Sequence, residues 1–273
     1  NFGRASVVSA PEVIEVVPAD DRVAVPRRHR WTRGDWQLLP WMVSGMSGRF
    51  LPAHERFSSI AQWKMLDNLR RTLCAPLLVL TLAVCWHLPF HEALVWTVFL
   101  LSAGSLPAFL PVLPELVPRR EWITWRSYLN VIGTSVREAA VMVFLNITFL
   151  AHQAFLMGDA IARTLIRVFL TRRYMLQWIS AAQVAAETRS GTSDYYTRML
   201  SAPVLAGALT LAVAFRAPWN LFLTLPFTVL WGISPAVAMW ASRKPVIAAL
   251  SLPSRTDIRT LRMAARRTWR FFE

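Results

Sequence analysis

A dense group of basic, aromatic and acidic residues lies shortly before the first long apolar run of this 273-residue chain. The group runs from Arg27 to Gln37 and reads RRHRWTRGDWQ. Arginine guanidinium groups make bidentate contacts with phosphate oxygens, and a tryptophan ring offers a flat apolar face to a pyranose ring. Such a group just under a bilayer could hold a sugar diphosphate and pass on a sugar chain.

Seven residues of this group are candidates for binding a substrate or its diphosphate: Arg27, His29, Arg30, Trp31, Arg33, Asp35 and Trp36. Arg30 could clamp the pyrophosphate while Trp31 stacks on the acceptor sugar, or the two side chains could snorkel and form an aromatic belt at the interface. His29 is the weaker candidate, because a histidine in such a place is more often a structural hydrogen-bonding group. Asp35 could accept from a sugar hydroxyl or pair with Arg30 or Arg33.

The alternative for the whole group is a juxtamembrane basic patch that binds anionic lipid head groups. Lipid electrostatics require neither the Gly34-Asp35 pair nor three closely spaced tryptophans, which are Trp31, Trp36 and Trp41. The residue types therefore favour a binding site.

The composition predicts an integral membrane protein. Hydrophobic residues make up 55% of the chain, and 30 Lys and Arg stand against 16 Asp and Glu, a net charge of +14. The basic residues avoid the apolar runs and gather at their ends, which is typical of topology determinants and argues against a nucleic-acid partner. The lipid bilayer is the first partner that the sequence implies.

Four apolar runs are long enough to cross or nearly cross a bilayer: 73–90, 93–117, 200–215 and 218–242. Short turns join the first two runs and the last two, so each pair predicts a helical hairpin. Arg216 is the one Lys or Arg in either turn. By the positive-inside rule the turns face the periplasm or exterior, and both termini and the middle segment face the cytoplasm.

The middle segment, 118–199, is expected to hold cytoplasmic and interfacial helices. Its apolar stretch 139–157 has basic residues on both flanks, so an interfacial or re-entrant position is favoured over a true span. The following residues, 159–180, predict an amphipathic helix on the membrane surface or packed on a soluble domain, with Asp159 and Arg163 as an i,i+4 ion pair. Residues 57–72 predict a similar interfacial helix, opened by a capping box at Ser59.

Motifs of many other enzyme classes are missing. The chain has no Gly-rich phosphate loop, no HExxH or CxxC motif, no nucleophile elbow and no Asp-x-Asp pair for a divalent cation. Cys74 and Cys85 fall in one apolar run, too far apart on a helix for a disulfide. Any catalytic or substrate-binding residues of this chain are therefore expected within 27–37, or they are absent.

Several motifs of the chain resemble a known family. Arg27-x-x-Arg30-Trp31 looks like a variant of the Gln-x-x-Arg-Trp signature of processive inverting glycosyltransferases, with Arg at the Gln position. The string RHRWTRGDWQLLPW (28–41) is similar to the cyclic β-1,2-glucan synthase branch. Further matches are WKMLDNLRRTL (63–73), DAIARTLIRVFLTRRYMLQW (159–178), LWGISPAVAMW (230–240) and RRTWRFFE (266–273).

The resemblance implies a membrane-embedded piece of a much larger synthase. It implies a glycosyltransferase A-type domain that ends within 1–56, contains the UDP-glucose site and the catalytic base, and has upstream ligands for Mg²⁺ or Mn²⁺. Residues 243–273 would begin a glycoamylase-like region, and the cyclic glucan would be destined for the periplasm. Arg27, Arg30 and Trp31 would lie at the acceptor and diphosphate end of the active site, with His29, Arg33, Asp35 and Trp36 in the branch-specific extension.

The expected fold is therefore an all-α membrane protein with about four transmembrane helices in two hairpins, interfacial amphipathic helices and the tail end of a glycosyltransferase domain. We expect it in the bacterial inner membrane, partnered by UDP-glucose, the growing glucan and the other domains of the same synthase. The piece alone should not transfer sugar, because the base and metal motifs fall outside it. The rival interpretation is a non-enzymatic membrane scaffold or exporter for a periplasmic glucan, for which Trp86, Trp96, Trp231 and Trp240 could supply an aromatic lining.

Overall fold

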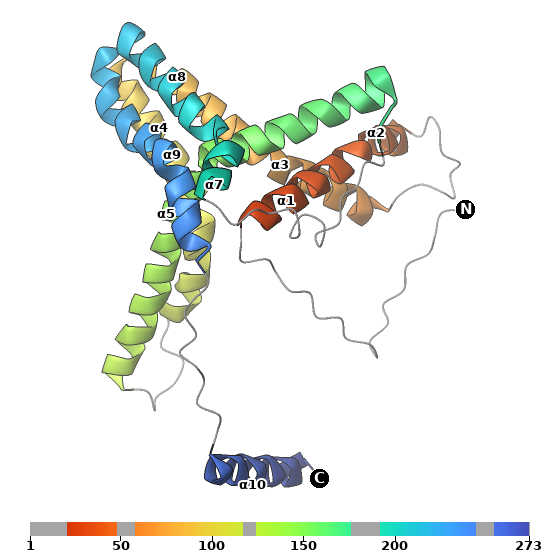
Figure 1. The fold of residues 1–273 in the computed structure, drawn as a ribbon, viewed down its shortest axis with the longest axis vertical. Coiled ribbons are helices and arrows are strands. Elements are labelled where there is room, and N and C mark those ends of the chain that lie inside the picture. The colour runs from red at the N-terminus through yellow and green to blue at the C-terminus, as the bar shows by residue number, and fades with distance from the viewer. Residues whose placement is uncertain (1–20, 48–57, 117–123, 176–191, 244–253, 273) are drawn as a thin grey trace. The chain divides into compact units, whose positions relative to one another are not determined.

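The computed structural model describes residues 21–47, 58–116, 124–175, 192–243 and 254–272. The chain divides into two units, residues 1–242 and residues 243–273. Every regular element in these described ranges is helical, as Figure 1 shows, and the all-α prediction is confirmed.

The first unit holds the elements α1 (Asp21–Gln37), α2 (Leu39–Ser47), α3 (Ser59–Cys85), α4 (Phe90–Phe109), η2 (Leu110–Leu116), α5 (Trp125–Leu165), η3 (Ile166–Thr171), α7 (Thr192–Arg198), α8 (Ser201–Arg216), η4 (Pro218–Asn220) and α9 (Leu221–Ala241). The N-cap of α3 is Ser58, one residue before the predicted Ser59, and its hydroxyl accepts a hydrogen bond from the amide of Ala61. The element η3 is a π-helical end of α5 and not a separate helix. The helix predicted over 159–180 is therefore the last part of α5 with η3: residues 159–171 are helical, 172–175 are not, and 176–180 lie outside the described residues.

Two helical hairpins form the centre of the unit, as the sequence predicts. Helices α3 and α4 are joined by a tight turn after Cys85, and α8 and α9 are joined through η4. Trp86 and Trp231 are fully buried between the hairpins and pack against each other and against Phe227, with ring centroids 5.4 to 6.4 Å apart. The indole N–H of Trp86 donates to Thr97 and that of Trp231 to the carbonyl of Ile147, so both buried polar atoms are satisfied.

Asn220 joins the two interhelical turns. Its side-chain amide is almost fully buried and donates to the carbonyls of Trp86 and Leu88, both at 2.8 Å. These carbonyls lie at the C-cap of α3 and in the turn that follows it, where no further helical turn can satisfy them. One side chain thus fixes the α8–α9 turn against the α3–α4 turn.

By length and composition, four helical stretches could cross a membrane: α3, α4 with η2, α5 with η3, and α9 with η4, and the bent pair α7 and α8 would make a fifth. Their most apolar windows are only 11% to 39% buried inside the protein. Aliphatic and aromatic side chains such as Leu80, Phe99 and Phe222 point outward instead. Such an apolar exterior is stable in lipid and not in water.

Helix α5 differs from the four predicted spans. The stretch 139–157 is the middle of one continuous helix, and its residues Leu150, Ala151 and Ala154 enter the central core. At one end, the hydroxyl of Tyr128 donates to the carbonyl of Leu116. At the other end, Ile161 and Leu165 pack beside Leu69, near the start of α3.

The first end of α5 thus contacts η2, and its other end contacts the first half of α3. Both contacts lie away from the two interhelical turns. Figure 1 shows the helix bending between its two halves. The middle of α5 therefore enters the helical core while neither end reaches the turns.

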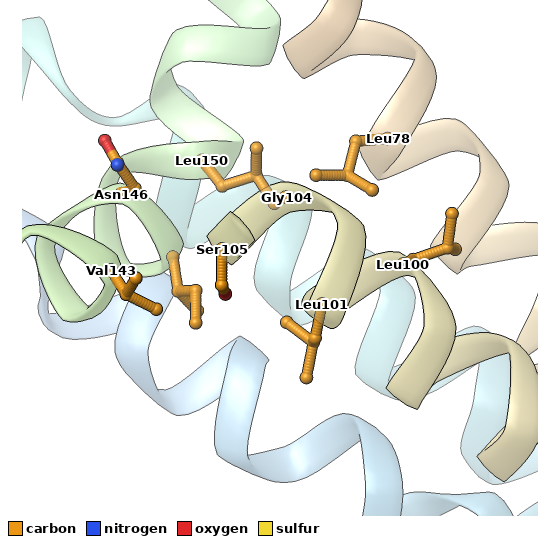
Figure 2. Close-up of a pocket in the computed structure, with 9 residues that line it drawn as sticks. Leu78, Leu100, Leu101, Gly104, Ser105, Val143, Asn146 and Leu150 are labelled. Carbon is orange, nitrogen blue, oxygen red and sulfur yellow. The ribbon is translucent and has the colours of Figure 1, made fainter. Parts of the chain in front are cut away.

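A small cavity lies among α3, α4 and α5 (Figure 2). Its volume is about 60 Å³ and its lining is almost wholly apolar, with Asn146 and Ser105 as polar side chains among leucines and valine. The lining of this cavity therefore offers few hydrogen-bond partners to a sugar.

The second unit contains α10 (Arg255–Phe272). The hydroxyl of Ser254 accepts from the amide of Asp257, and the carboxylate of Asp257 accepts from the amide of Ser254. This reciprocal capping satisfies two of the amides that have no partner at a helix start. Helix α10 thus carries its own start signal.

Candidate signature helix

All seven candidate residues lie on α1, and they divide between two faces of that helix. His29, Thr32 and Trp36 are spaced three and four apart, so they share the face that packs against α5 and α3. Arg27, Arg30 and Trp31 also follow helical spacing and share a different face. The two faces have different neighbours and therefore different chemistry.

His29 is held by the end of α5. Its Nε2 lies 3.0 Å from Oδ2 of Asp159, whose other oxygen accepts from Arg163 at 2.7 Å. Because a carboxylate can only accept, Nε2 carries the hydrogen. Burial lowers the pKa of His29 below its usual value, against the opposite effect of Asp159, so the ring is neutral at pH 7. The predicted Asp159–Arg163 pair is confirmed, and His29 has the structural role that the sequence allowed.

Trp36 anchors the other end of the same face. Its side chain is buried with Met42 and Leu69, and its indole N–H donates to the hydroxyl of Thr72 at 2.9 Å. Between His29 and Trp36, the buried hydroxyl of Thr32 donates to the sulfur of Met157. This face is therefore filled by protein side chains, and it offers no room for a sugar.

Asp35 pairs with neither arginine that the sequence suggested. Its carboxylate accepts from the side-chain amide of Asn68 on α3 at 3.3 Å. Burial raises the pKa of Asp35, and the hydrogen bond from Asn68 partly offsets that effect. Asp35 thus lies at the edge of the contact between α1 and α3.

The face with Arg27, Arg30 and Trp31 carries the residues best suited to a ligand. The guanidinium of Arg27 lies 4.3 Å from the ring centroid of Trp31, one helical turn away, and the Trp31 side chain is 52% exposed. A cation over one ring face orients the indole. Gly34, one turn further along the same face, adds no side chain, and a Cβ there would meet open space.

Arg33 lies between the two faces and close to other cations. Burial lowers the pKa of its guanidinium, and the nearby Arg167 and Arg163 lower it further. Three guanidinium groups at the junction of α1 and the end of α5 produce a positive potential, which favours a multiply charged anion such as a diphosphate.

Sequence reasoning missed the partners that position α1. Asp159, Thr72 and Asn68 each contact α1 from a helix distant in the chain, and the side-chain amide of Gln37 donates to the carbonyl of Met175 at 2.9 Å. Thr72 and Asn68 carry no local signal of such a role. Asp159 was recognised only as the partner of Arg163, because a contact between residues 130 positions apart has no period in the sequence.

Within the described residues, no group of three or more His, Cys, Asp or Glu side chains could hold a metal ion. Cys74 is exposed and Cys85 is buried, and both are free thiols. The face of α1 with Arg27, Arg30 and Trp31 presents guanidinium groups and an indole ring, residue types that can contact anions and sugars.

The sequence was compared with known proteins. No protein-family model matches the chain. Over its whole length it is 36% identical to cyclic beta-(1,2)-glucan synthase NdvB of Rhizobium meliloti (strain 1021). The chain is similar to one segment of that synthase. It spans only 9% of the length of NdvB, so the similarity concerns a small part of a very long protein.

Proposed function

We propose that this chain is the membrane-embedded part of a processive inverting glucosyltransferase that makes cyclic β-1,2-glucan from UDP-glucose. In this proposal the chain anchors the synthase in the bacterial inner membrane. It also supplies the face of α1 with Arg27, Arg30 and Trp31 to the acceptor and diphosphate side of the active site. The similarity to NdvB along the whole chain is the observation that carries the proposal.

The arrangement of α1 supports this role. The helix is fixed through His29 and Trp36, so the face with Arg27, Arg30 and Trp31 is held in one orientation. An inverting transfer needs a glucose hydroxyl aligned with the anomeric carbon of UDP-glucose while negative charge grows on the leaving diphosphate. Trp31 would stack on the acceptor glucose, and Arg30, with Arg27 and Arg33 beside it, would stabilise the diphosphate.

The rest of the machinery is proposed to lie in other parts of the synthase. A Mg²⁺ or Mn²⁺ ion bound there would neutralise the diphosphate of the donor, and the base would come from the same domain. We therefore expect this chain alone to bind the membrane without transferring glucose.

Replacing Trp31 by Ala in the intact synthase tests the proposal. Glucan synthesis from UDP-glucose should fall at least 100-fold, while the amount of synthase in the membrane stays the same. Trp219→Ala is the matched control, because Trp219 is also strongly exposed but lies in the turn between α8 and α9. Normal synthesis by the Trp31 variant, or an equal loss in the control, would rule out the assigned role.

The structure gives the exporter alternative little support. Trp86 and Trp231 belong to the central core, with satisfied indole N–H groups, so they line no passage. Trp96 and Trp240 are largely exposed on the apolar exterior. Aromatic rings in such positions are typical of membrane-interface packing.

A further inference from the structure

Helix α10 separates charged and apolar side chains along its length. Arg259, Arg262, Arg266 and Arg270 recur at intervals of three and four residues and form one stripe. Ile258, Leu261, Ala265 and Trp269 recur in the same way and form a second stripe beside it, and Leu261 and Trp269 are both more than 60% exposed. Ile258, at the start of the same stripe, is also exposed.

From this pattern we propose that α10 lies in the plane of the membrane surface and binds anionic phospholipid through the arginine stripe and the adjacent apolar stripe.

The relative position of the two stripes favours a bilayer over other partners. At about 100° per residue, the arginine stripe is centred roughly a quarter turn from the apolar stripe. A helix lying with the apolar stripe towards the acyl chains thus places the guanidinium groups sideways, at the level of the phosphates. Nucleic acid would bind the arginines but offers no apolar layer for Ile258, Leu261 and Trp269.

Charge and connectivity support the same partner. Asp257 is the one acidic residue among Arg255–Phe272, and its carboxylate is already used in capping the helix start. The remaining charges are positive and match a leaflet rich in acidic lipids. Helix α9 is a candidate span that ends at Ala241, and α10 begins shortly afterwards in the chain, at Arg255. A bilayer is therefore always within reach of α10.

The test uses the full chain in lipid nanodiscs, with Cys74→Ser and Cys85→Ala as background and one new cysteine for an environment-sensitive fluorophore. Leu261→Cys places the fluorophore on the apolar stripe. Thr256→Cys is the matched control, because Thr256 lies on the opposite side of the same helix. Nitroxide-labelled lipids then report whether each fluorophore enters the bilayer.

In nanodiscs with about a third phosphatidylglycerol, the fluorophore at 261 should be quenched at least threefold more than that at 256. The difference should disappear in pure phosphatidylcholine. Arg262→Gln should weaken the bilayer-bound state about fivefold, the equivalent of roughly 1 kcal/mol per arginine near an anionic surface. Arg267→Gln, which removes a charge outside the stripe, should weaken it less than twofold.

Three results would overturn the proposal. Equal exposure to water at both positions would mean that α10 does not bind the bilayer. A fluorophore at 261 that is shielded from water but not quenched by lipid would identify a protein surface as its partner. Equal quenching in both lipid compositions would remove the role of the arginine stripe.

Discussion

At the scale of single residues, the two central tryptophans of α1 have opposite roles although they are only five positions apart. Trp36 is buried and donates a hydrogen bond to Thr72, whereas Trp31 is half exposed and stacked under Arg27. The sequence placed both in one substrate-binding group. Composition and spacing predicted the group, but which face of α1 is buried depends on α3 and α5, whose contacts are not visible in the sequence.

This difference in burial predicts that loss of Trp36 destabilises the protein much more than loss of Trp31. Trp36→Ala should lower the free energy of unfolding by about 3 kcal/mol, because a large buried ring leaves a cavity. Trp31→Ala should lower it by less than about 1 kcal/mol, as expected for an exposed side chain. Thermal unfolding in mild detergent measures both effects. Equal losses would mean that the two rings are equally buried and would contradict the division of α1 into two faces.

His29 predicts a dependence of stability on pH. Its pKa in the folded protein is lowered from the ordinary value of 6.5 by burial, so the unfolded chain binds a proton more readily below that pH. The free energy of unfolding should therefore be unaffected by His29 above about pH 7 and should decrease as the pH falls below 6.5.

The measurement is the unfolding midpoint of the native chain and of His29→Gln between pH 7.5 and 5.5. The native chain should lose more stability on acidification than the variant, in which residue 29 can no longer take up a proton. Parallel curves for the two proteins would show that His29 titrates normally in the fold.

At the scale of elements, the sequence predicted the two hairpins well because each span is a continuous apolar run between turn residues. It did not predict how the hairpins are joined. Asn220 falls inside the predicted apolar run 218–242, where nothing indicated that its amide donates to two carbonyls more than 130 positions away. The π-helical end of α5 also carried no signal, since the residues of η3 are compatible with an ordinary helix.

Asn220→Ala should therefore destabilise the contact between the hairpins. Two buried carbonyls lose their donor, and an unsatisfied buried acceptor costs about 1–3 kcal/mol, so a loss of about 2 kcal/mol or more is expected. Asn130→Ala, at an exposed position of α5, is the matched control and should change stability by less than about 0.5 kcal/mol. Unfolding in detergent compares the two, and equal midpoints would show that Asn220 contributes no more than a surface amide.

At the scale of the whole molecule, the open question of the sequence was whether residues 139–157 cross the membrane. Length and composition make α5 a candidate span. Its contacts argue otherwise, because Tyr128 near one end and Ile161 near the other both meet parts of the protein that lie away from the interhelical turns. We therefore propose that α5 enters the inner leaflet and returns, with α3, α4, α8 and α9 as the true spans and both termini in the cytoplasm.

Reporter fusions distinguish this topology from a fully crossing α5. Fluorescent-protein fusions after positions 120 and 182, which flank α5 and η3, should both be fluorescent, because both sites are expected in the cytoplasm. Alkaline phosphatase should be active when fused after 88 or 217, in the two turns. If α5 crosses, its flanks must lie on opposite sides and only one of the fusions at 120 and 182 can fluoresce. Because α3 and α4 are the only proposed spans between α1 and position 120, fluorescence of the fusion at 120 places α1 in the cytoplasm, and fluorescence at both 120 and 182 also places the end of α9 there.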